Sequence, residues 1–285
     1  MRLRSVVLLS LLAGCSGEGT APPKDATPPA PLAPSTGAAE KAPDVKFDLA
    51  TLQAEAKPAA LVPSPVEMQK ALAAAGITTR LATLVSARNI ETVVPDKNAS
   101  AVRTGVVLAD LVLTVKDATT PQIVAQLGRV KQGLQALGGS ADLAATIDDL
   151  SNRLTNDAIS RDDLVKELDE LRGVMVPAGS YEVGDNAVPL ILAGSWVEGS
   201  HLVAAAMKAE NKYDGADNLL KQPAVVDYFL EYVKEEGAAQ RAPGDLVAKL
   251  ETTLTELKAI AAKPTLGKED VERIHSATGE VLALL

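Results

Sequence analysis

Two Glu-x-x-His pairs are the part of the sequence whose residue types and spacing most suggest chemistry. Glu198 lies three residues before His201 and Glu272 lies three residues before His275, and these are the chain's two histidines. Residues three apart lie on one face of a helix. Two such pairs on separate helices are half of the ligand set of di-iron carboxylate sites, which take a further Glu from each of two other helices. One interpretation of the pattern is therefore a metal site.

The remaining Glu residues do not complete this ligand set. Glu67, Glu167 and Glu170 lie on segments with the pattern of ordinary amphipathic helices. His275 falls at the edge of the apolar stripe of its own segment, which is typical of a half-exposed residue. We therefore expect no metal cofactor, and we keep the two Glu-x-x-His pairs as the ligands that a metal would require.

Asp110 stands out because Val, Leu and Ala surround it over three turns of the segment 100–117. A buried carboxylate is costly unless it is paired, hydrogen-bonded or protonated. Its candidate partners are Arg103, two turns earlier on about the same face, the Trp196 indole N–H and a helix amino terminus. We expect Asp110 to be a buried polar lock that fixes helix register, with a role in binding a ligand or a metal as the alternative.

The stretch LILAGSWVEGSH, residues 190–201, places the only Trp of the chain in an otherwise apolar helix. A buried indole needs an acceptor for its N–H, and the small residues Gly194, Ser195 and Gly199 should allow another backbone to approach closely. We expect Trp196 to pack in the core, with the wall of a pocket as the alternative. If the protein binds a small ligand, the candidate residues are Asp110, Trp196, Glu198 and His201.

Composition narrows the classes of function. The formal net charge is −9 with a pI near 4.9 and no evident basic patch, which argues against nucleic-acid binding. Aromatic residues make up 2% of the chain, so platforms for stacking bases have little to be built from. The sequence has no Walker A loop, no Gly-x-Ser-x-Gly elbow and no second cysteine. We therefore expect a protein that is not an enzyme.

The chain begins MRLRSVVLLSLLAGCSG, which has the order of a signal peptide over residues 1–14: two arginines, a short apolar run, and small residues before a cysteine. The end of this stretch closely resembles the lipobox of bacterial lipoproteins. That resemblance implies cleavage before Cys15, diacylglycerol on its sulfur and a fatty acyl chain such as palmitate on its amino group. Ser16 follows, where an Asp often marks inner-membrane retention, so we expect the outer membrane of the cell envelope.

Residues 15–46 comprise the expected lipidated Cys and a linker rich in Pro and Ala. Such a segment cannot bury enough apolar surface to offset the entropy of ordering it, so we expect a disordered tether. The expected partners of the protein are accordingly the membrane, reached through the lipid anchor, and an envelope protein. We expect no nucleic-acid partner.

Apolar residues recur at helical spacing throughout residues 47–285. We interpret this body as one all-α domain, a bundle of about ten helices, because no repeat persists that would favour a solenoid. The segments 100–117 and 186–210 are apolar on nearly every face and should pack against each other at the centre. The expected helices span about 65–76, 78–87, 100–117, 120–137, 140–154, 160–175, 186–210, a segment from Pro223, 244–262 and 268–284.

A membrane span over Val188–Ala206 is an alternative for the second of these segments by length alone. Glu198 and His201 disfavour it, because ionisable groups are rare inside a membrane-spanning helix. We therefore prefer the core helix of a folded body.

Three stretches, PSPVEMQKALAAAGI (63–77), GVVLADL (105–111) and LILAGSWVEG (190–199), resemble a family of uncharacterised bacterial helical lipoproteins, in which they occur in the same order. The resemblance covers roughly residues 60–210. It departs from the family at Ser195, where a Gly is usual, and at His201, where an aromatic residue is usual. It implies a helical architecture with a shared central feature at Asp110, Trp196 and Glu198. Together these features predict a membrane-anchored envelope lipoprotein, a non-catalytic structural or interaction module; the alternative is a helical domain that binds a small ligand or metal.

Overall fold

Helices make up the regular structure of the computed structural model, which describes residues 62–85, 88–174, 187–240 and 245–285. No strand occurs within these ranges, so the predicted all-α class is confirmed. The described residues belong to one unit by their contacts, Asp48–Leu285. The predicted signal peptide, Cys15 and tether lie outside them.

The helices follow the order expected from the sequence, with two differences. In chain order they are α2 (Pro65–Ala74), the 3-10 helix η2 (Leu81–Thr83), α3 (Lys97–Thr114), α4 (Thr120–Ala136), α5 (Ala141–Thr155), α6 (Arg161–Val174), α7 (Val188–Glu210), α8 (Ala216–Leu220), α9 (Pro223–Gln240), α10 (Asp245–Ala261) and α11 (Lys268–Leu282).

Capping residues fix several of the helix starts. At α2 the Ser64 hydroxyl accepts a hydrogen bond from the Glu67 N–H at 3.2 Å, and the Glu67 carboxylate accepts one from the Ser64 N–H at 2.6 Å. Ser140 caps α5 through the Leu143 N–H at 3.1 Å. These side chains satisfy N–H groups that the first turn of a helix leaves free. Because such capping residues can be recognised in the sequence, the predicted starts of these helices lie close to the observed ones.

The predicted packing of α3 against α7 is confirmed, and these two helices form the most extensive helix pair of the described residues. A Cβ on Gly105 of α3 would overlap the carbonyl oxygen of Ile191, and a Cβ on Gly194 of α7 would overlap that of Val102. Glycine at both positions therefore lets the two backbones touch. Because each helix is covered on nearly every side, each is apolar all round.

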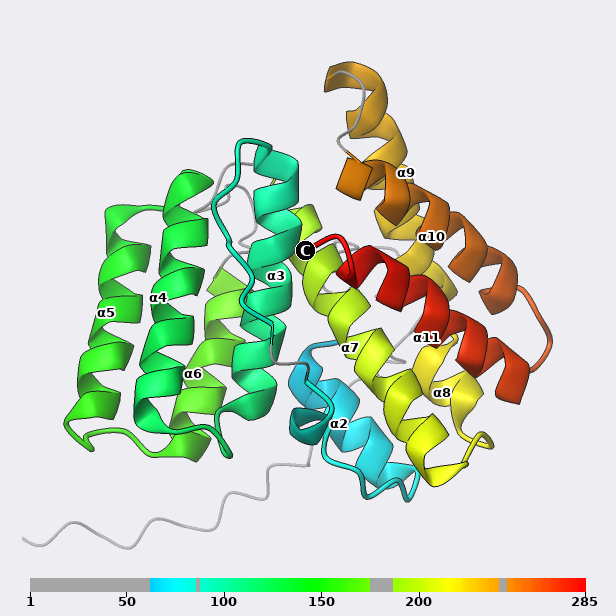
Figure 1. Cartoon of the computed structure of the whole chain (residues 1–285), viewed down its shortest axis with the longest axis horizontal. Helices are drawn as coiled ribbons and strands as arrows, with labels where there is room; N and C mark the ends of the chain where they lie inside the picture. The colour runs from blue at the N-terminus through cyan, green and yellow to red at the C-terminus, as the bar shows by residue number, and fades with distance from the viewer. Residues whose placement is uncertain (1–61, 86–87, 175–186, 241–244) are drawn as a thin grey trace, which may run out of the picture. The chain divides into compact units, whose positions relative to one another are not determined.

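The other helices extend from this central pair in two directions (Figure 1). On one side α4 packs against α3, and α5 packs against α4. On the other side α11 packs against α7, and α10 packs against both α11 and α9. The short helices α2 and α8 contact α7 and each other.

The segment 78–87 does not form the predicted helix; within it only η2 is helical. Glu210, the last residue of α7, explains the difference. Its Oε1 accepts hydrogen bonds from the backbone N–H groups of Thr78 and Thr79, both at 2.7 Å, and from their two hydroxyls. The Leu81 N–H likewise donates to the Gln69 side chain at 2.9 Å. Because side chains from elsewhere satisfy these groups, the segment needs no helical hydrogen bonds.

α7 is the one helix of the described residues that is long and apolar enough to cross a membrane, judged by length and composition. In this structure 89% of its most apolar window is buried by other parts of the protein. Burial by α2, α3 and α11 gives the apolar surface of α7 a protein environment.

Candidate functional site

Asp110 of α3 and Glu198 of α7 meet at the crossing of the two central helices, where both contact Arg88. Arg88 Nη2 lies 2.6 Å from Glu198 Oε1 and 3.5 Å from Asp110 Oδ2. Asp110 is 6% exposed and Glu198 is 1% exposed. The structure thus brings together two of the four candidate ligand-binding residues, in a buried charge cluster that we call the Arg88–Asp110–Glu198 cluster.

Arg103 is not the partner of Asp110. Its guanidinium donates instead to the carbonyl oxygens of Leu285 at 2.7 Å, Leu284 at 3.1 Å and Glu91 at 3.3 Å. Long side chains on a helix point toward its amino terminus, so Arg103 extends away from Asp110 even though both lie on about the same face. The partner comes instead from outside the helix.

Arg88 lies between η2 and α3, in a segment that has neither helix nor strand where it is described. Its side chain is 21% exposed, so it reaches inward from the edge of the core. Arg88 could not be predicted from the sequence, because an arginine in a segment without periodicity has no predicted face. Only the three-dimensional path of the segment identifies its partner.

The cluster is electrostatically incomplete, since two carboxyl groups share one guanidinium. Asp110 Oδ1, Glu198 Oε2 and Arg88 Nε are buried and have no hydrogen-bond partner. Nη2 of Arg88 is close to Glu198, but its N–H is not aligned for a hydrogen bond, so this contact is an ion pair. Buried polar atoms without partners are uncommon in folded proteins and call for an explanation.

Burial and the neighbouring Glu198 together raise the pKa of Asp110 to about 8, and Arg88 offsets only part of this effect. The pKa of Arg88 is raised, because its contacts with Glu198 and Asp110 outweigh the opposing effect of burial. Arg88 is therefore a cation at every ordinary pH, whereas the surroundings of Asp110 favour its protonated form.

Trp196 lies apart from this cluster. Its indole Nε1 donates to Gln222 Oε1 at 2.7 Å, and its ring centroid lies 5.6 Å from that of Phe229. The cavity beside it has a volume of only about 10 Å³, too small for a ligand. Trp196 is therefore a core residue, and its acceptor, Gln222, is a second residue that sequence reasoning did not find.

His201 and His275 stack on each other, with ring centroids 4.2 Å apart and an angle of 19° between the ring planes. His201 Nδ1 lies 3.1 Å from the His275 carbonyl oxygen, which can only accept, so this nitrogen donates. His275 Nδ1 lies 3.1 Å from Lys208 Nζ, which can only donate, so this nitrogen accepts. The two rings thus join α7 to α11.

The two Glu-x-x-His pairs do not converge on one point. An imidazole lone pair lies in the plane of its ring, and direct ligation needs about 2.0–2.1 Å from nitrogen to metal. Two nearly parallel rings 4.2 Å apart cannot both meet that condition in this arrangement. Glu198 contacts Arg88, and the half-exposed Glu272 faces Lys268 at 3.9 Å. Within the described ranges no three His, Cys, Asp or Glu residues are grouped so that they could hold a metal ion.

Both histidines are held in the neutral form. Burial is the main cause that lowers the pKa of His275 to about 4, and the nearby His201 and Lys208 lower it further. Burial also lowers the pKa of His201, and Arg88 and Lys208 add to this effect, while the hydrogen bond to His275 opposes it. The stacked rings are therefore uncharged at neutral pH and behave as a packing contact.

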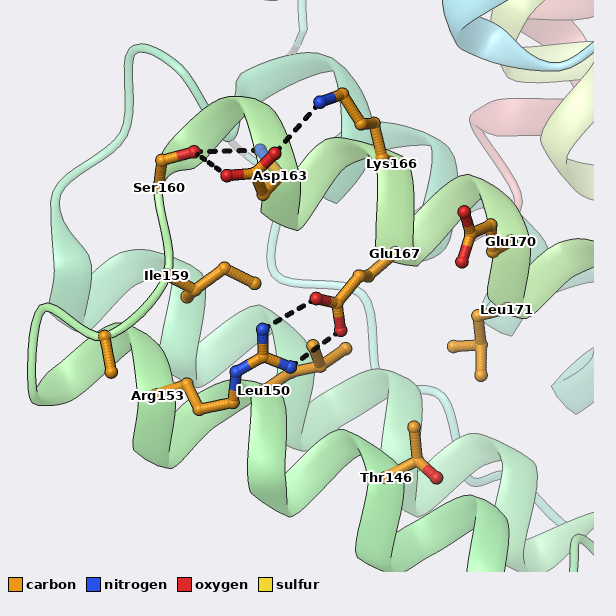
Figure 2. A pocket seen from close by; sticks show the side chains of 11 residues that line it. Thr146, Leu150, Arg153, Ile159, Ser160, Asp163, Lys166, Glu167, Glu170 and Leu171 are labelled. Carbon is orange, nitrogen blue, oxygen red and sulfur yellow. Dashed lines mark hydrogen bonds and ion pairs between the residues drawn. The ribbon is translucent and has the colours of Figure 1, made fainter. Parts of the chain in front are cut away.

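A cavity of about 530 Å³ lies between α5 and α6 (Figure 2). Arg153 reaches across it and donates to both carboxylate oxygens of Glu167, at 2.7 and 2.8 Å. At the start of α6, Asp163 bonds to Ser160 and to Lys166. Because both cations of the cavity are paired with carboxylates, the cavity presents no free cation to an anionic ligand.

No protein-family model matches the chain, and no curated protein or solved structure is significantly similar to it. The Arg88–Asp110–Glu198 cluster is the strongest candidate, because its buried charges are incompletely paired.

Proposed function

We propose that the protein is a lipid-anchored lipoprotein of the bacterial cell envelope, whose helical body is a non-catalytic structural or interaction module. One observation carries the proposal. The only cysteine of the chain, Cys15, directly follows Leu-Ala-Gly at the end of a short apolar run that two arginines precede. Several acyl chains on one residue give stable anchoring, since each buried methylene contributes about 0.8 kcal/mol.

A non-catalytic role is supported by the contacts of the unusual polar residues of the helical body, which bond to other parts of the protein. Trp196 is bonded to Gln222, His201 to the backbone of α11, and Glu198 to Arg88. These contacts join helices and leave the side chains engaged with the protein rather than with a cleft. The motifs GVVLADL and LILAGSWVEG supply both glycines of the α3–α7 contact, in keeping with the helical architecture that the resemblance to helical lipoproteins implies.

Replacement of Cys15 tests the anchor. Full-length protein expressed in a Gram-negative host should incorporate a labelled fatty acid and sediment with membranes, whereas Cys15→Ala should do neither. The matched control is Ser16→Ala, which leaves the cysteine in place and should behave as wild type. Unchanged labelling and membrane fractionation of Cys15→Ala would refute the proposal.

The same position tests the membrane of residence. Ser16→Asp should move the protein from the outer-membrane to the inner-membrane fraction in an enteric host, while Ser16→Ala stays in the outer membrane. Inner-membrane residence of the wild-type protein would contradict the outer-membrane assignment without affecting the lipid anchor.

A second candidate function, binding of a metal or small ligand, is favoured by one observation, the unpartnered oxygens of Asp110 and Glu198. Metal analysis of protein purified without a chelating tag or resin tests the metal case. We expect substoichiometric iron, manganese and zinc. A full equivalent that is lost in the double variant Asp110→Asn, Glu198→Gln would favour the metal-binding function instead.

A further inference from the structure

We propose that Asp110 and Glu198 form a buried proton-binding site, closed by Arg88, that holds one proton between its two carboxyl groups at neutral pH. The proposal concerns the centre of the helical body and does not depend on the lipid anchor. It also gives a reason for the unpartnered atoms of the cluster.

The three charged groups of the cluster do not balance. With both carboxyl groups ionised, the cluster would carry two negative charges and one positive charge inside the protein. An uncompensated buried charge costs several kcal/mol, even after the protein relaxes around it. One further positive charge makes the cluster neutral, so the core favours uptake of a single cation.

The unpartnered oxygen atoms of the cluster are suited to share a proton. Asp110 Oδ1 and Glu198 Oε2 are buried acceptors without partners. A carboxyl group that gains a proton becomes a hydrogen-bond donor as well as an acceptor, so one proton converts an acceptor-only pair into a pair that can bond internally. Two carboxyl groups that share a site in this way have one strongly raised pKa.

The close packing around the cluster favours a proton as this cation. The backbones of α3 and α7 touch at Gly105 and Gly194, which lie one turn or so from the two carboxyl groups. The described cavities of about 530, 270 and 10 Å³ are lined by other residues. Arg88, the most exposed of the three side chains at 21%, already contacts both carboxyl groups. A proton needs no added volume, whereas a metal ion needs room and further ligands.

The charged groups that face Asp110 come from two elements, α7 and the segment before α3. Glu198 of α7 raises the pKa of Asp110 and Arg88, from the segment before α3, lowers it; burial has the largest effect and also raises it. His201, one turn beyond Glu198, is held neutral and adds no charge. The balance leaves the pKa of Asp110 at about 8, in agreement with the charge argument.

The bound proton makes the stability of the α3–α7 crossing depend on pH. The folded protein holds it up to about pH 8, whereas an unfolded Asp releases it near its ordinary pKa of 3.8. The folded state thus binds more protons over this range, so the stabilisation is complete below pH 3.8 and is lost as the pH rises through 8. Above that pH the cluster carries a net negative charge, which weakens the α3–α7 contact at Arg88.

Infrared spectroscopy of the full-length protein tests the site, because the carbonyl band of a protonated carboxyl group is separate from the bands of a carboxylate. We expect such a band at neutral pH, with loss of the band near pH 8, and absence of the band in Asp110→Asn. The control is Asp148→Asn, which removes an exposed carboxylate paired with Lys131 and should leave the band unchanged.

Glu198→Gln tests whether the carboxyl groups act as a pair, and it carries the test alone if Asp110→Asn fails to fold. Without the charge of Glu198, the pH at which the band disappears should fall by about 1–3 units, as removal of a like charge predicts. The proposal is overturned if folded wild-type protein shows no such band at neutral pH, or if the band keeps its pH dependence in Glu198→Gln. Loss of the wild-type band on addition of Ca²⁺ or Zn²⁺ at neutral pH would make the site a metal site instead.

Discussion

Gly105 of α3 lies against the carbonyl oxygen of Ile191 of α7, so closely that no side chain fits between them. Gly194 makes the reciprocal contact with Val102 of α3. The two helices that carry Asp110 and Glu198 therefore cross with their backbones in contact. The separation of the two helices, and with it the position of both carboxyl groups, depends on residues that have no side chain.

Substitution of Gly105 by Ala should destabilise the protein, because the added methyl group meets backbone atoms that cannot move aside. Overpacking of a core costs about 1–3 kcal/mol, and we expect the upper end of that range or more. Chemical denaturation of the unlipidated chain, residues 16–285, measures the change in the free energy of unfolding.

Gly128 of α4 is the matched control for this experiment. A Cβ at Gly128 has nothing within 4 Å, so Gly128→Ala gains helix propensity without a clash. It should stabilise the protein by about 0.5–1 kcal/mol. Equal effects of the two Gly→Ala substitutions would contradict close contact of α3 with α7.

The bond between Trp196 and Gln222 predicts a coupled pair of substitutions. Trp196→Ala should cost about 3–5 kcal/mol, as large-to-small changes in a core do. Gln222→Ala leaves the buried indole N–H without an acceptor and should cost about 1–3 kcal/mol. Near-wild-type melting of Trp196→Ala would rule out its place in the core.

Trp196→Phe separates the hydrogen bond from the packing of the ring. In that background no N–H remains for Gln222 to accept, so Gln222→Ala should cost much less than it does in the wild type. A double-mutant cycle measures the difference between the two costs. Additive effects of the two substitutions would mean that the hydrogen bond does not contribute to stability.

The sequence predicted the helices that have a clear apolar period and a capping residue. The helices α2, α5, α3 and α7 were predicted because their signals lie within the segments themselves. These signals are the Ser caps of α2 and α5 and the all-round apolar character of the central pair. The error at 78–87 has a non-local cause, since Glu210 lies more than 130 residues away and supplies the competing acceptor. The five-residue α8 was missed because one turn is too short for a period to show.

The candidate site was predicted in part. A carboxylate on an apolar helix signals burial, so Asp110 and Glu198 were identified as unusual residues from their neighbours alone. Their partner was not, because Arg88 lies in a segment without a periodic pattern and is brought to them by the chain path. The three-residue spacing predicted that Glu198 and His201 share one face of the helix, but it could not show that they contact different elements, Arg88 and α11.

The His201–His275 stack predicts acid sensitivity. In the folded protein His275 binds a proton only near pH 4, whereas in the unfolded chain it does so near its ordinary pKa of 6.5. The unfolded state therefore binds more protons between these values, so the contribution of His275 is complete above pH 6.5 and is lost as the pH falls toward 4. His201 acts in the same direction because its pKa is also lowered.

Thermal unfolding at pH 6.5 and pH 4, compared between wild type and His275→Gln, isolates this effect. On going from pH 6.5 to pH 4, the stability of wild type should change in a less favourable direction than that of His275→Gln, which cannot be protonated at this position. Asp110 acts in the opposite direction in both proteins and cancels in the comparison. Glu272→Gln, an exposed change on the same helix, should keep the wild-type difference; a wild-type response in His275→Gln would refute the role of the stack.

Arg88→Met should be among the most damaging single substitutions in the body, because it leaves Asp110 and Glu198 without a cation. Removal of one member of a buried ion pair costs about 3–5 kcal/mol, most of it from the charge left behind. The matched control is Arg80→Met, which breaks an ion pair whose arginine is 63% exposed and should cost at most about 1 kcal/mol. Addition of Glu198→Gln to Arg88→Met should restore part of the loss, since it removes the charge that was left unpaired. If Arg88→Met costs no more than Arg80→Met in denaturant unfolding, Arg88 does not close the cluster, and the charge argument for the centre of the protein fails with it.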